Sequence, residues 1–521
     1  MEYDDRKRKR FVNTITGENG KFQYDIHPWV FFVSAFIIAV GVVTTILAGH
    51  LAKDVFLYIQ NYISKYLGWF YVLVVNIVLI YCISLMFSKY GNLKIGGSEA
   101  EPEFSLLSWF AMLFSAGMGI GLLFYGVAEP IFHYSGNYFN EATDISKAKT
   151  AMNLTFLHWG LHPWAIYSLV GLGLAFFGFS EKLPFSIRNI FYPLLGKKIH
   201  GFFGNFIDII AVVTCLYGLA TSLGLGVKQV NAGLNILFGI RESTNVQIIL
   251  VAIITSIALW SVMRGLDKGI KFLSNINMVV VILLMILIIC LGPTLFILNT
   301  FVENIGSFLQ QFPKLAFWKE AYTMKEWQNN WTMFYWGWWI SWSPFVGMFI
   351  ARISYGRTIR EFLGGVLFVP TILTFLWMTT FGDSALYLEI FKNINLTTPV
   401  KNNIAVALFE FFKYFPTANL ISIIALFVIV SFFVTSSDSG SMVIDIITSG
   451  GNPNPPKIQR LFWAILEGFV AATLVVSGGL VALQTASIIA GLPFAIVLLL
   501  MCWSVNKGLK RAYKRYVEAN I

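Results

Sequence analysis

The chain has 521 residues, of which 57% are hydrophobic and only 12% are charged, and its formal net charge is +10. Soluble domains carry about 25% charged residues, so this composition excludes an ordinary water-soluble fold and indicates an integral membrane protein. The positive net charge does not indicate a nucleic-acid partner, because the Lys and Arg residues are concentrated in segments next to predicted membrane spans. The expected partner of the surface is a lipid bilayer, and no nucleic acid is expected.

Twelve segments are apolar enough to cross a hydrocarbon layer as helices, which takes about 20 residues each. They are residues 29–51, 69–88, 106–128, 153–178, 205–228, 246–263, 275–294, 330–350, 363–386, 416–447, 460–480 and 484–506. The sequence therefore predicts an all-α polytopic membrane protein with one membrane domain over residues 29–506.

Short polar segments complete the predicted organisation. Residues 1–28 form an N-terminal tail that is too polar for a cleavable signal, and residues 507–521 form a short basic C-terminal tail. Lys and Arg are more frequent on the side that holds both tails, which predicts that both termini are cytoplasmic. Residues 295–312 have an amphipathic pattern, and we expect a helix that lies along the outer membrane surface.

Two of the predicted spans contain residues that disfavour a straight helix. The third span contains Gly117, Gly119 and Gly121, and the eighth contains the run from Ser341 to Pro344. A Gly costs about 1 kcal/mol and a Pro about 3 kcal/mol in a helix interior. Broken helices five spans apart predict inverted repeats of spans 3–7 and 8–12 with a binding site at the midplane. The alternative for the glycines is close helix packing.

Aromatic residues are concentrated in two of the spans. Five tryptophans lie between Trp331 and Trp342, and Trp159, Trp164 and Tyr167 form a second cluster. Aromatic belts normally lie at membrane interfaces, but several of these residues are in the middle of a span. Indole faces in a bundle interior favour a cage for a quaternary ammonium group. Trp338 is expected to point elsewhere, either to lipid or to a neighbouring helix.

Oxygen-bearing residues in the tenth span are candidates for an ion site. Na⁺ prefers oxygen ligands, and the hydroxyls of Thr435 and Ser436 would join carbonyls freed between Ser115 and Met118. The alternative is that the hydroxyls bond to their own helix.

Acidic residues within membrane spans are functional candidates by default. The acids considered are Glu129, Asp383, Asp438 and Glu467. Asp438 is interpreted as a structural acceptor, with a proton relay as the alternative. The cysteines and histidines lack the spacing of a disulfide framework or a metal site, and no phosphate-binding loop or HExxH motif is present. The sequence predicts neither an enzyme nor a cofactor.

Four strings resemble those of the betaine/choline/carnitine transporters. They are Gly117-Met118-Gly119-Ile120-Gly121, the run from His158 to Tyr167, the run from Tyr335 to Pro344, and the run from Thr435 to Ser439. The resemblance extends over nearly the whole chain. It implies twelve helices with an inverted repeat of five helices, and a homotrimer with the helix at 295–312 near its contacts.

The resemblance also implies roles for individual residues. By position, Trp159, Trp164, Tyr167 and Trp339 correspond to a trimethylammonium cage, with Trp342 on the inward path. Gly117, Gly119 and Gly121 correspond to an unwound stretch whose N–H groups receive a substrate carboxylate. A sodium site would use Ser115, Met118, Phe432, Thr435 and Ser436, where Ser115 replaces the usual alanine.

Two positions bear on the substrate and on the coupling ion. Choline-carrying relatives tend to have an aspartate where this chain has Gly121, so a zwitterion with its own carboxylate fits better. Relatives with two sodium sites have threonines where this chain has Cys215 and Leu219, which are poor ligands for Na⁺. Thr214, Thr221 or Ser222 would have to replace them.

The expected function is secondary active import of glycine betaine or a related trimethylammonium or sulfonium zwitterion. We expect sodium coupling and alternating access, in the inner membrane of a bacterium. The alternative transporter is a proton-coupled choline or carnitine carrier with Asp438 or Glu129 as its relay. A membrane-embedded enzyme is a third class, for which His158 and His162 are the candidates.

Overall fold

The computed structural model describes residues 13–16, 23–117, 119–264, 267–322 and 326–519. Most of these residues are helical. Two strands, β1 (Asn13–Thr16) and β2 (Gln23–Ile26), pair as an antiparallel hairpin within the predicted N-terminal tail. The backbone N–H of Asp25 donates to the Gln459 side chain, so the hairpin is tied to the membrane domain.

The helices follow one another along the whole chain, and most connections are short. The long helices are α2 (Pro28–Ala48), α3 (Ala52–Phe87), α10 (Phe202–Phe238), α11 (Thr244–Arg264), α12 (Asp267–Leu291), α13 (Thr294–Ala316), α15 (Thr332–Arg352), α16 (Ile359–Met378), α20 (Ala418–Thr448) and α21 (Lys457–Ala519). The shorter ones are α4 (Leu106–Gly117), α5 (Ile120–Gly136), α6 (Asp144–Trp159), α7 (Leu161–Ala175), α8 (Ile187–Ile190), α9 (Tyr192–Leu195), α14 (Trp327–Asn330), α17 (Ser384–Phe391), α18 (Thr397–Asn402) and α19 (Ala407–Phe412). The π-helical segments η3 (Phe176–Ser180) and η5 (Thr379–Asp383) continue α7 and α16.

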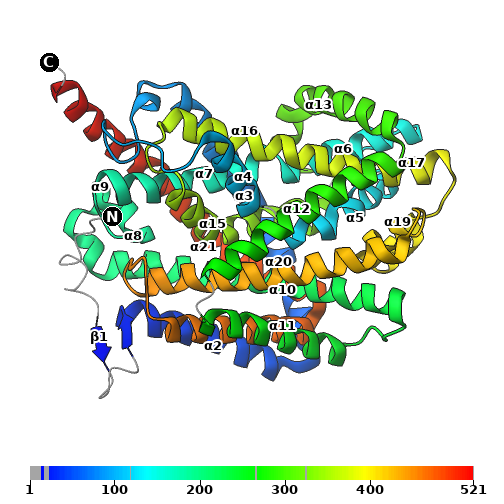
Figure 1. Ribbon diagram of the computed structural model, residues 1–521, viewed down its shortest axis with the longest axis horizontal. Coiled ribbons are helices and arrows are strands. Elements are labelled where there is room, and N and C mark those ends of the chain that lie inside the picture. The colour runs from blue at the N-terminus through cyan, green and yellow to red at the C-terminus, as the bar shows by residue number, and fades with distance from the viewer. Residues whose placement is uncertain (1–12, 17–22, 118, 265–266, 323–325, 520–521) are drawn as a thin grey trace.

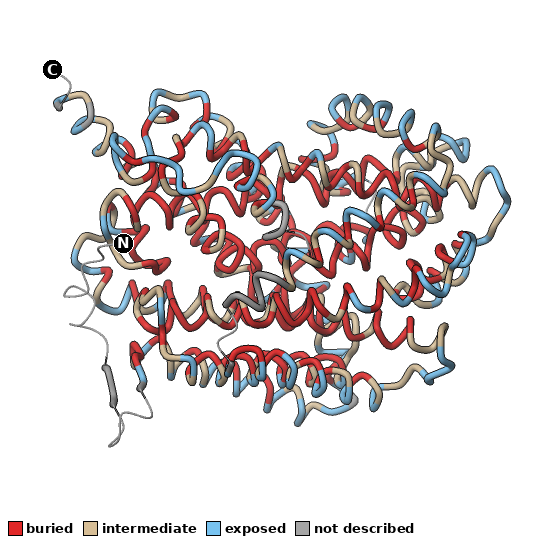
Figure 2. Tube along the Cα trace, viewed as in Figure 1, coloured by how far each residue is buried: buried red, intermediate tan, exposed pale blue. Residues whose placement is uncertain are grey.

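The outer helices expose apolar side chains, whereas the inner helices are buried. Figure 1 shows α2 and α11 along one edge of the bundle and α13 along the opposite edge. Phe36 on α2, Trp260 on α11 and Leu283 on α12 are more than half exposed, and Figure 2 shows exposed stretches along these edge helices. Such apolar surface is unstable in water and suits a hydrocarbon environment.

Hydropathy and length support many of the predicted spans. Within the described residues, nine helical segments are long and apolar enough to cross a membrane. The predicted spans 460–480 and 484–506 both fall in α21, which kinks at Gly479, where φ is 58°. The predicted third span is divided between α4 and α5, which are 12 and 17 residues long. The total of twelve membrane spans and the inverted repeat of spans 3–7 and 8–12 therefore stay predictions.

The break predicted in the third span is present. α4 ends at Gly117 and α5 begins at Ile120, with Gly119 in an extended conformation between them. The predicted ligand Met118 lies outside the described residues. A second break separates α6 from α7 at Gly160, where the backbone is also non-helical. Both breaks lie next to the aromatic residues that the sequence singled out.

The break predicted in the eighth span is absent, and that prediction is wrong. α15 continues through Pro344 from Thr332 to Arg352. A proline cannot donate to the carbonyl four residues before it, which leaves the carbonyl of Ile340 without its helical partner. The Ser343 hydroxyl donates to that carbonyl at 2.7 Å, which satisfies the carbonyl and lets the helix continue.

The predicted surface segment 295–312 is helical and lies within α13. Leu295, Val302 and Leu309 are exposed along it, and Phe308 is buried. The helix packs against α6 and η5, and its other side faces outward at the edge of the bundle (Figure 1).

Candidate functional site

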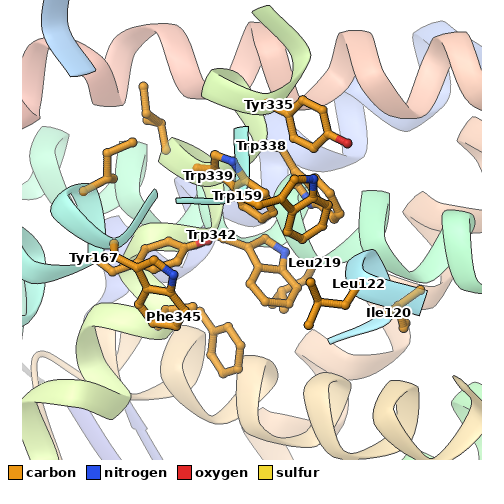
Figure 3. Packing of buried hydrophobic residues seen from close by; sticks show 14 of the residues in the cluster. Ile120, Leu122, Trp159, Tyr167, Leu219, Tyr335, Trp338, Trp339, Trp342 and Phe345 are labelled. Atoms are coloured by element: carbon orange, nitrogen blue, oxygen red, sulfur yellow. The ribbon is translucent and has the colours of Figure 1, made fainter. Parts of the chain in front are cut away.

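The aromatic residues of α6, α7 and α15 converge in the interior of the bundle. We use the term aromatic cage for Trp159, Trp164, Tyr167 and Trp339. The Trp339 ring lies 5.0 Å from Trp159 and 6.4 Å from Tyr167 between centroids, and Trp164 lies 5.6 Å from Tyr167. These pairs meet at 73° to 87°, so ring edges meet ring faces. Figure 3 shows three of these rings gathered between the helices.

The backbone explains why residues from three helices meet here. The break at Gly160 places Trp159 at the end of α6 and lets α7 start in a new direction. A Cβ at Gly160 would lie 2.6 Å from the carbonyl of Phe156 and 2.8 Å from the ring of Phe375, so the position accepts only glycine without a shift. α15 packs directly against α7, which brings Trp339 to Tyr167.

Hydrogen bonds fix the indole rings of this region. The Trp339 N–H donates to the backbone carbonyl of His158 at 2.8 Å. The Trp342 N–H donates to the carbonyl of Gly218 at 3.1 Å, and the Trp159 N–H donates to Glu129 Oε2 at 2.7 Å. Each ring is therefore held at its polar edge by a hydrogen bond to a neighbouring helix or side chain.

Trp342 lies one helical turn beyond the cage on α15. Its ring contacts Trp338 and Phe345 at centroid distances of 6.1 and 5.6 Å. A Cβ at Gly119 would lie 3.2 Å from the Trp342 ring, so the ring also approaches the break between α4 and α5. Its place on the inward path stays a prediction.

Trp338 was expected to point to lipid or to a neighbouring helix, and its indole N–H does reach a neighbouring helix, α10. Its ring stacks on Trp339 with centroids 4.7 Å apart and planes 15° apart, and its N–H donates to Ser222 at 3.0 Å. Adjacent residues on a helix point about 100° apart, which suggested that only one of them faces the site. Because α15 is covered by α3, α7, α10 and α21, side chains on several of its sides are buried in the core.

The glycine stretch lies against the indole rings. Gly117 ends α4, Gly119 lies in the break, and Gly121 is in the first turn of α5. A Cβ at Gly121 would come within 2.8 Å of both Trp159 and Trp338. Only glycine allows this approach of the backbone to the two rings.

The predicted sodium ligands are only partly described. Met118 and the side chain of Ser115 lie outside the described part of the structure. Phe432 and Thr435 are buried in α20, and Ser436 is partly exposed. The Thr435 hydroxyl donates to the carbonyls of Ser431 and Phe432 at 3.1 and 3.0 Å, so it bonds to its own helix. Its oxygen can still accept, which a cation ligand requires.

The hydroxyls that were considered for a second sodium site have structural partners. Thr214 donates to the carbonyl of Ala490 and Thr221 to that of Leu483, each at 2.8 Å, which ties α10 to α21. Ser222 accepts from Trp338 and donates to Gly218. Leu219 packs against Gly440 of α20, where a Cβ would lie 2.4 Å from the leucine side chain.

The four acids singled out by the sequence are all buried. Asp383 accepts from Asn304 at 2.7 Å and does not lie at an exposed interface. Asp438 lies 3.7 Å from Arg460, in agreement with a structural acceptor.

Glu467 accepts from Ser437 at 3.2 Å. The carboxylate of Glu129 accepts the indole N–H of Trp159 in the cage at 2.7 Å. No local sequence pattern indicates this contact, because the two residues belong to different helices.

A family model described as the betaine/carnitine/choline family transporter matches residues 29–514. The chain is 44% identical over 506 residues to glycine betaine transporter 1 of Vibrio parahaemolyticus, which covers 94% of this chain and 95% of the relative. It is 45% identical over 493 residues to the glycine betaine transporter OpuD of Bacillus subtilis, with 94% and 96% covered.

A third relative, a glycine betaine/proline/choline transporter of Vibrio parahaemolyticus, is 43% identical over 508 residues, with 94% of this chain and 91% of the relative covered. Family and relatives are transporters, so the chain is a multi-pass membrane transporter and not an enzyme. Together with the aromatic cluster at the helix breaks, these similarities show that the chain belongs to the betaine/carnitine/choline transporter family.

Proposed function

We propose that the protein imports glycine betaine, or a closely related trimethylammonium or sulfonium zwitterion, by sodium-coupled alternating access. The observation that carries the proposal is the convergence of Trp159, Tyr167 and Trp339 within 5.0 to 6.4 Å in the bundle interior. A methylated onium group has no N–H to donate, so ring faces are its natural partners, each worth about 2 kcal/mol when desolvated. Relatives with matching length carry glycine betaine in their names.

A zwitterion suits the glycine stretch better than choline. An acidic side chain at Gly121 would collide with Trp159 and Trp338, since even a Cβ lies 2.8 Å from both rings. The N–H groups at the start of α5 can instead face the carboxylate of the substrate, because a helix N-terminus favours anions. The cage would hold the cationic end and the broken segment, Gly117 to Gly121, the anionic end.

The proposed coupling ion is Na⁺, bound by Ser115, Met118, Phe432, Thr435 and Ser436. The support is the position of Thr435 and Ser436 on α20 and the oxygen preference of Na⁺. The protein needs no organic cofactor in this proposal. Alternating access would open the cage to each side in turn.

The proposed setting is the inner membrane of a bacterium, with both termini in the cytoplasm. We further propose a homotrimer with α13 near the contacts between protomers. The exposed apolar residues Leu295, Val302 and Leu309 of α13 support this placement, because they need either lipid or a protein partner.

A second candidate function is proton-coupled choline transport. It is favoured by the buried group of Glu129, His133 and His158 beside the cage, since acids and histidines in membrane spans often relay protons. Uptake of labelled substrate with Na⁺ replaced at constant pH separates the two. Loss of accumulation without Na⁺ supports the proposal, whereas undiminished accumulation supports the proton-coupled carrier.

Competition measurements test the substrate. Purified protein in proteoliposomes should accumulate labelled glycine betaine, and unlabelled betaine should compete better than choline. Stronger competition by choline would contradict the proposed substrate.

A further inference from the structure

Glu129 on α5 is the centre of a hydrogen-bonded group next to the cage. Its side chain is fully buried. Oε1 lies 2.6 Å from Nδ1 of His158 and 3.1 Å from Nε2 of His133. Oε2 accepts the indole N–H of Trp159 at 2.7 Å and the hydroxyl of Tyr335.

The number of hydrogen-bonding contacts around Glu129 suits the ionised form of its carboxyl group. An ionised carboxylate is acceptor-only and has room for about four hydrogen bonds on its two oxygens. Glu129 has four polar neighbours, which come from α5, α6 and α15. A buried charge is costly unless it is fully hydrogen-bonded, so the arrangement stabilises a charge at this place.

Glu129 holds one cage ring directly, because it accepts the indole N–H of Trp159. It also contacts the His158 side chain, whose far nitrogen lies 3.0 Å from the hydroxyl of Thr332. The next ring, Trp339, donates to the backbone carbonyl of His158, which α6 positions. Within the cage, Trp159 is therefore the ring whose hydrogen bond depends on this carboxylate.

The groups that accept the indole N–H of Trp338 and of Trp342 are uncharged. Trp338 donates to the Ser222 hydroxyl, and Trp342 donates to the Gly218 carbonyl. Trp159 differs from them because its N–H meets a carboxylate, which makes a charge-assisted and stronger hydrogen bond. This bond brings negative charge to the edge of a ring whose face belongs to the cage.

Glu129, His133 and His158 are also close enough to one another to hold a metal ion, because each places one ligand atom within 4.8 Å of the others. The two histidines, however, meet the same carboxylate oxygen at hydrogen-bond distances. The contacts therefore favour a hydrogen-bonded group over a metal centre.

We propose that Glu129 is a positioning residue that orients Trp159 in the cage, and that its negative charge makes the cage select a cationic headgroup over a neutral group of the same shape. This inference rests on the proposed function. Charges in a low-dielectric interior are weakly screened, so a carboxylate one indole away stabilises an onium group. A neutral group receives no such stabilisation.

The test compares glycine betaine with 3,3-dimethylbutanoate, in which carbon replaces the ammonium nitrogen. Proteoliposomes with native protein, Glu129→Gln or Glu129→Asp are assayed for betaine KM and for the inhibition constant of the isostere. In Glu129→Gln we expect the ratio of the betaine KM to the isostere inhibition constant to rise about tenfold, because both ligands carry the same carboxylate and only betaine carries the positive headgroup. Glu129→Asp keeps the charge and should retain most of the selectivity.

Asp383→Asn is the matched control, because Asp383 is a buried acid on neighbouring η5 that bonds to Asn304 instead of a cage ring. This substitution should leave the ratio of the betaine KM to the isostere inhibition constant unchanged. A Glu129→Gln protein that is correctly inserted and keeps the native ratio would overturn the inference. Absence of betaine uptake by native protein would instead refute the proposed function.

A double-mutant cycle tests whether Glu129 acts through Trp159. Trp159→Phe removes the N–H donor but keeps an aromatic ring. In that background Glu129→Gln should raise the betaine KM less than it does in native protein, since coupled residues are non-additive. Equal effects in both backgrounds would contradict the positioning role.

Discussion

Trp339 joins the two parts of the aromatic cage, because its ring contacts Trp159 on α6 and Tyr167 on α7. Trp339→Ala should raise the betaine KM about 30-fold, which corresponds to one lost cation–π contact of about 2 kcal/mol. The KM in proteoliposomes measures this effect.

The matched control for that substitution is Trp336→Ala. Trp336 is on the same helix and equally buried, but its ring packs on His162 at 4.9 Å. Both substitutions leave a cavity and should lower thermal stability to a similar degree. A similar KM increase in both would mean that the effect comes from packing and not from substrate contact.

Thr435 and Ser436 are tested by their effect on sodium dependence. The double substitution Thr435→Ala and Ser436→Ala should raise the half-saturating Na⁺ concentration at least about tenfold, or about 1.4 kcal/mol, because two oxygen ligands are lost. Betaine uptake at increasing Na⁺ concentrations measures it. Ser441→Ala is the control, because Ser441 is buried on the same helix and donates to the Asp438 carbonyl. An unchanged Na⁺ dependence in the double variant would exclude this site.

Gly121, in the first turn of α5, has no side chain, which lets the backbone approach two indole rings. At Gly121 an added methyl group would overlap the rings of Trp159 and Trp338. Gly121→Ala should shift both indoles and lower betaine uptake at least about tenfold, as overpacking of this kind costs about 1 to 3 kcal/mol. Gly306→Ala is the control, because no atom lies within 4 Å of a Cβ built at Gly306. Full uptake by Gly121→Ala would show that the rings need not contact α5.

Hydropathy predicted where most helices lie, because each membrane-spanning helix satisfies its backbone hydrogen bonds internally and needs a continuous run of apolar side chains. The low helix propensity of the glycines, and not hydropathy, predicted the break at Gly119. The break expected at Pro344 is absent because Ser343 satisfies the freed carbonyl, a compensation that a count of helix breakers does not include.

The composition of the site could be predicted only in part. Trp159, Trp164, Tyr167 and Trp339 were singled out from their density in apolar segments, and the structure brings them together. Glu129 contacts Tyr335, which lies 206 positions away, and no local pattern carries such a contact. The stacking of Trp338 on Trp339 was not predicted, because it depends on the helices that surround α15, which is a property of the tertiary packing.

The N-terminal hairpin and the C-terminal part of α21 lie at the same end of the bundle (Figure 1). His27 lies 3.3 Å from Arg188, which belongs to α8, and Ser504 of α21 donates to the carbonyl of Ile190 at the end of α8. Figure 1 shows β1 and the last turns of α21 on this side, with α17 and α19 at the far end. The N-terminal hairpin and the C-terminal helix therefore lie on the same side of the bundle, which the proposed orientation places in the cytoplasm.

Cysteine labelling tests this orientation. Asn395 is exposed between α17 and α18, and Asn454 is exposed between α20 and α21. After replacement of Cys82, Cys215, Cys290 and Cys502, a membrane-impermeant maleimide should label Asn395→Cys in intact cells. It should label Asn454→Cys only after permeabilisation, because the loop before α21 lies next to the N-terminal hairpin, where Asn452 donates to Asp25. The reverse pattern would mean that the protein has the opposite orientation, and betaine uptake by the cysteine-free protein serves as the control for correct insertion.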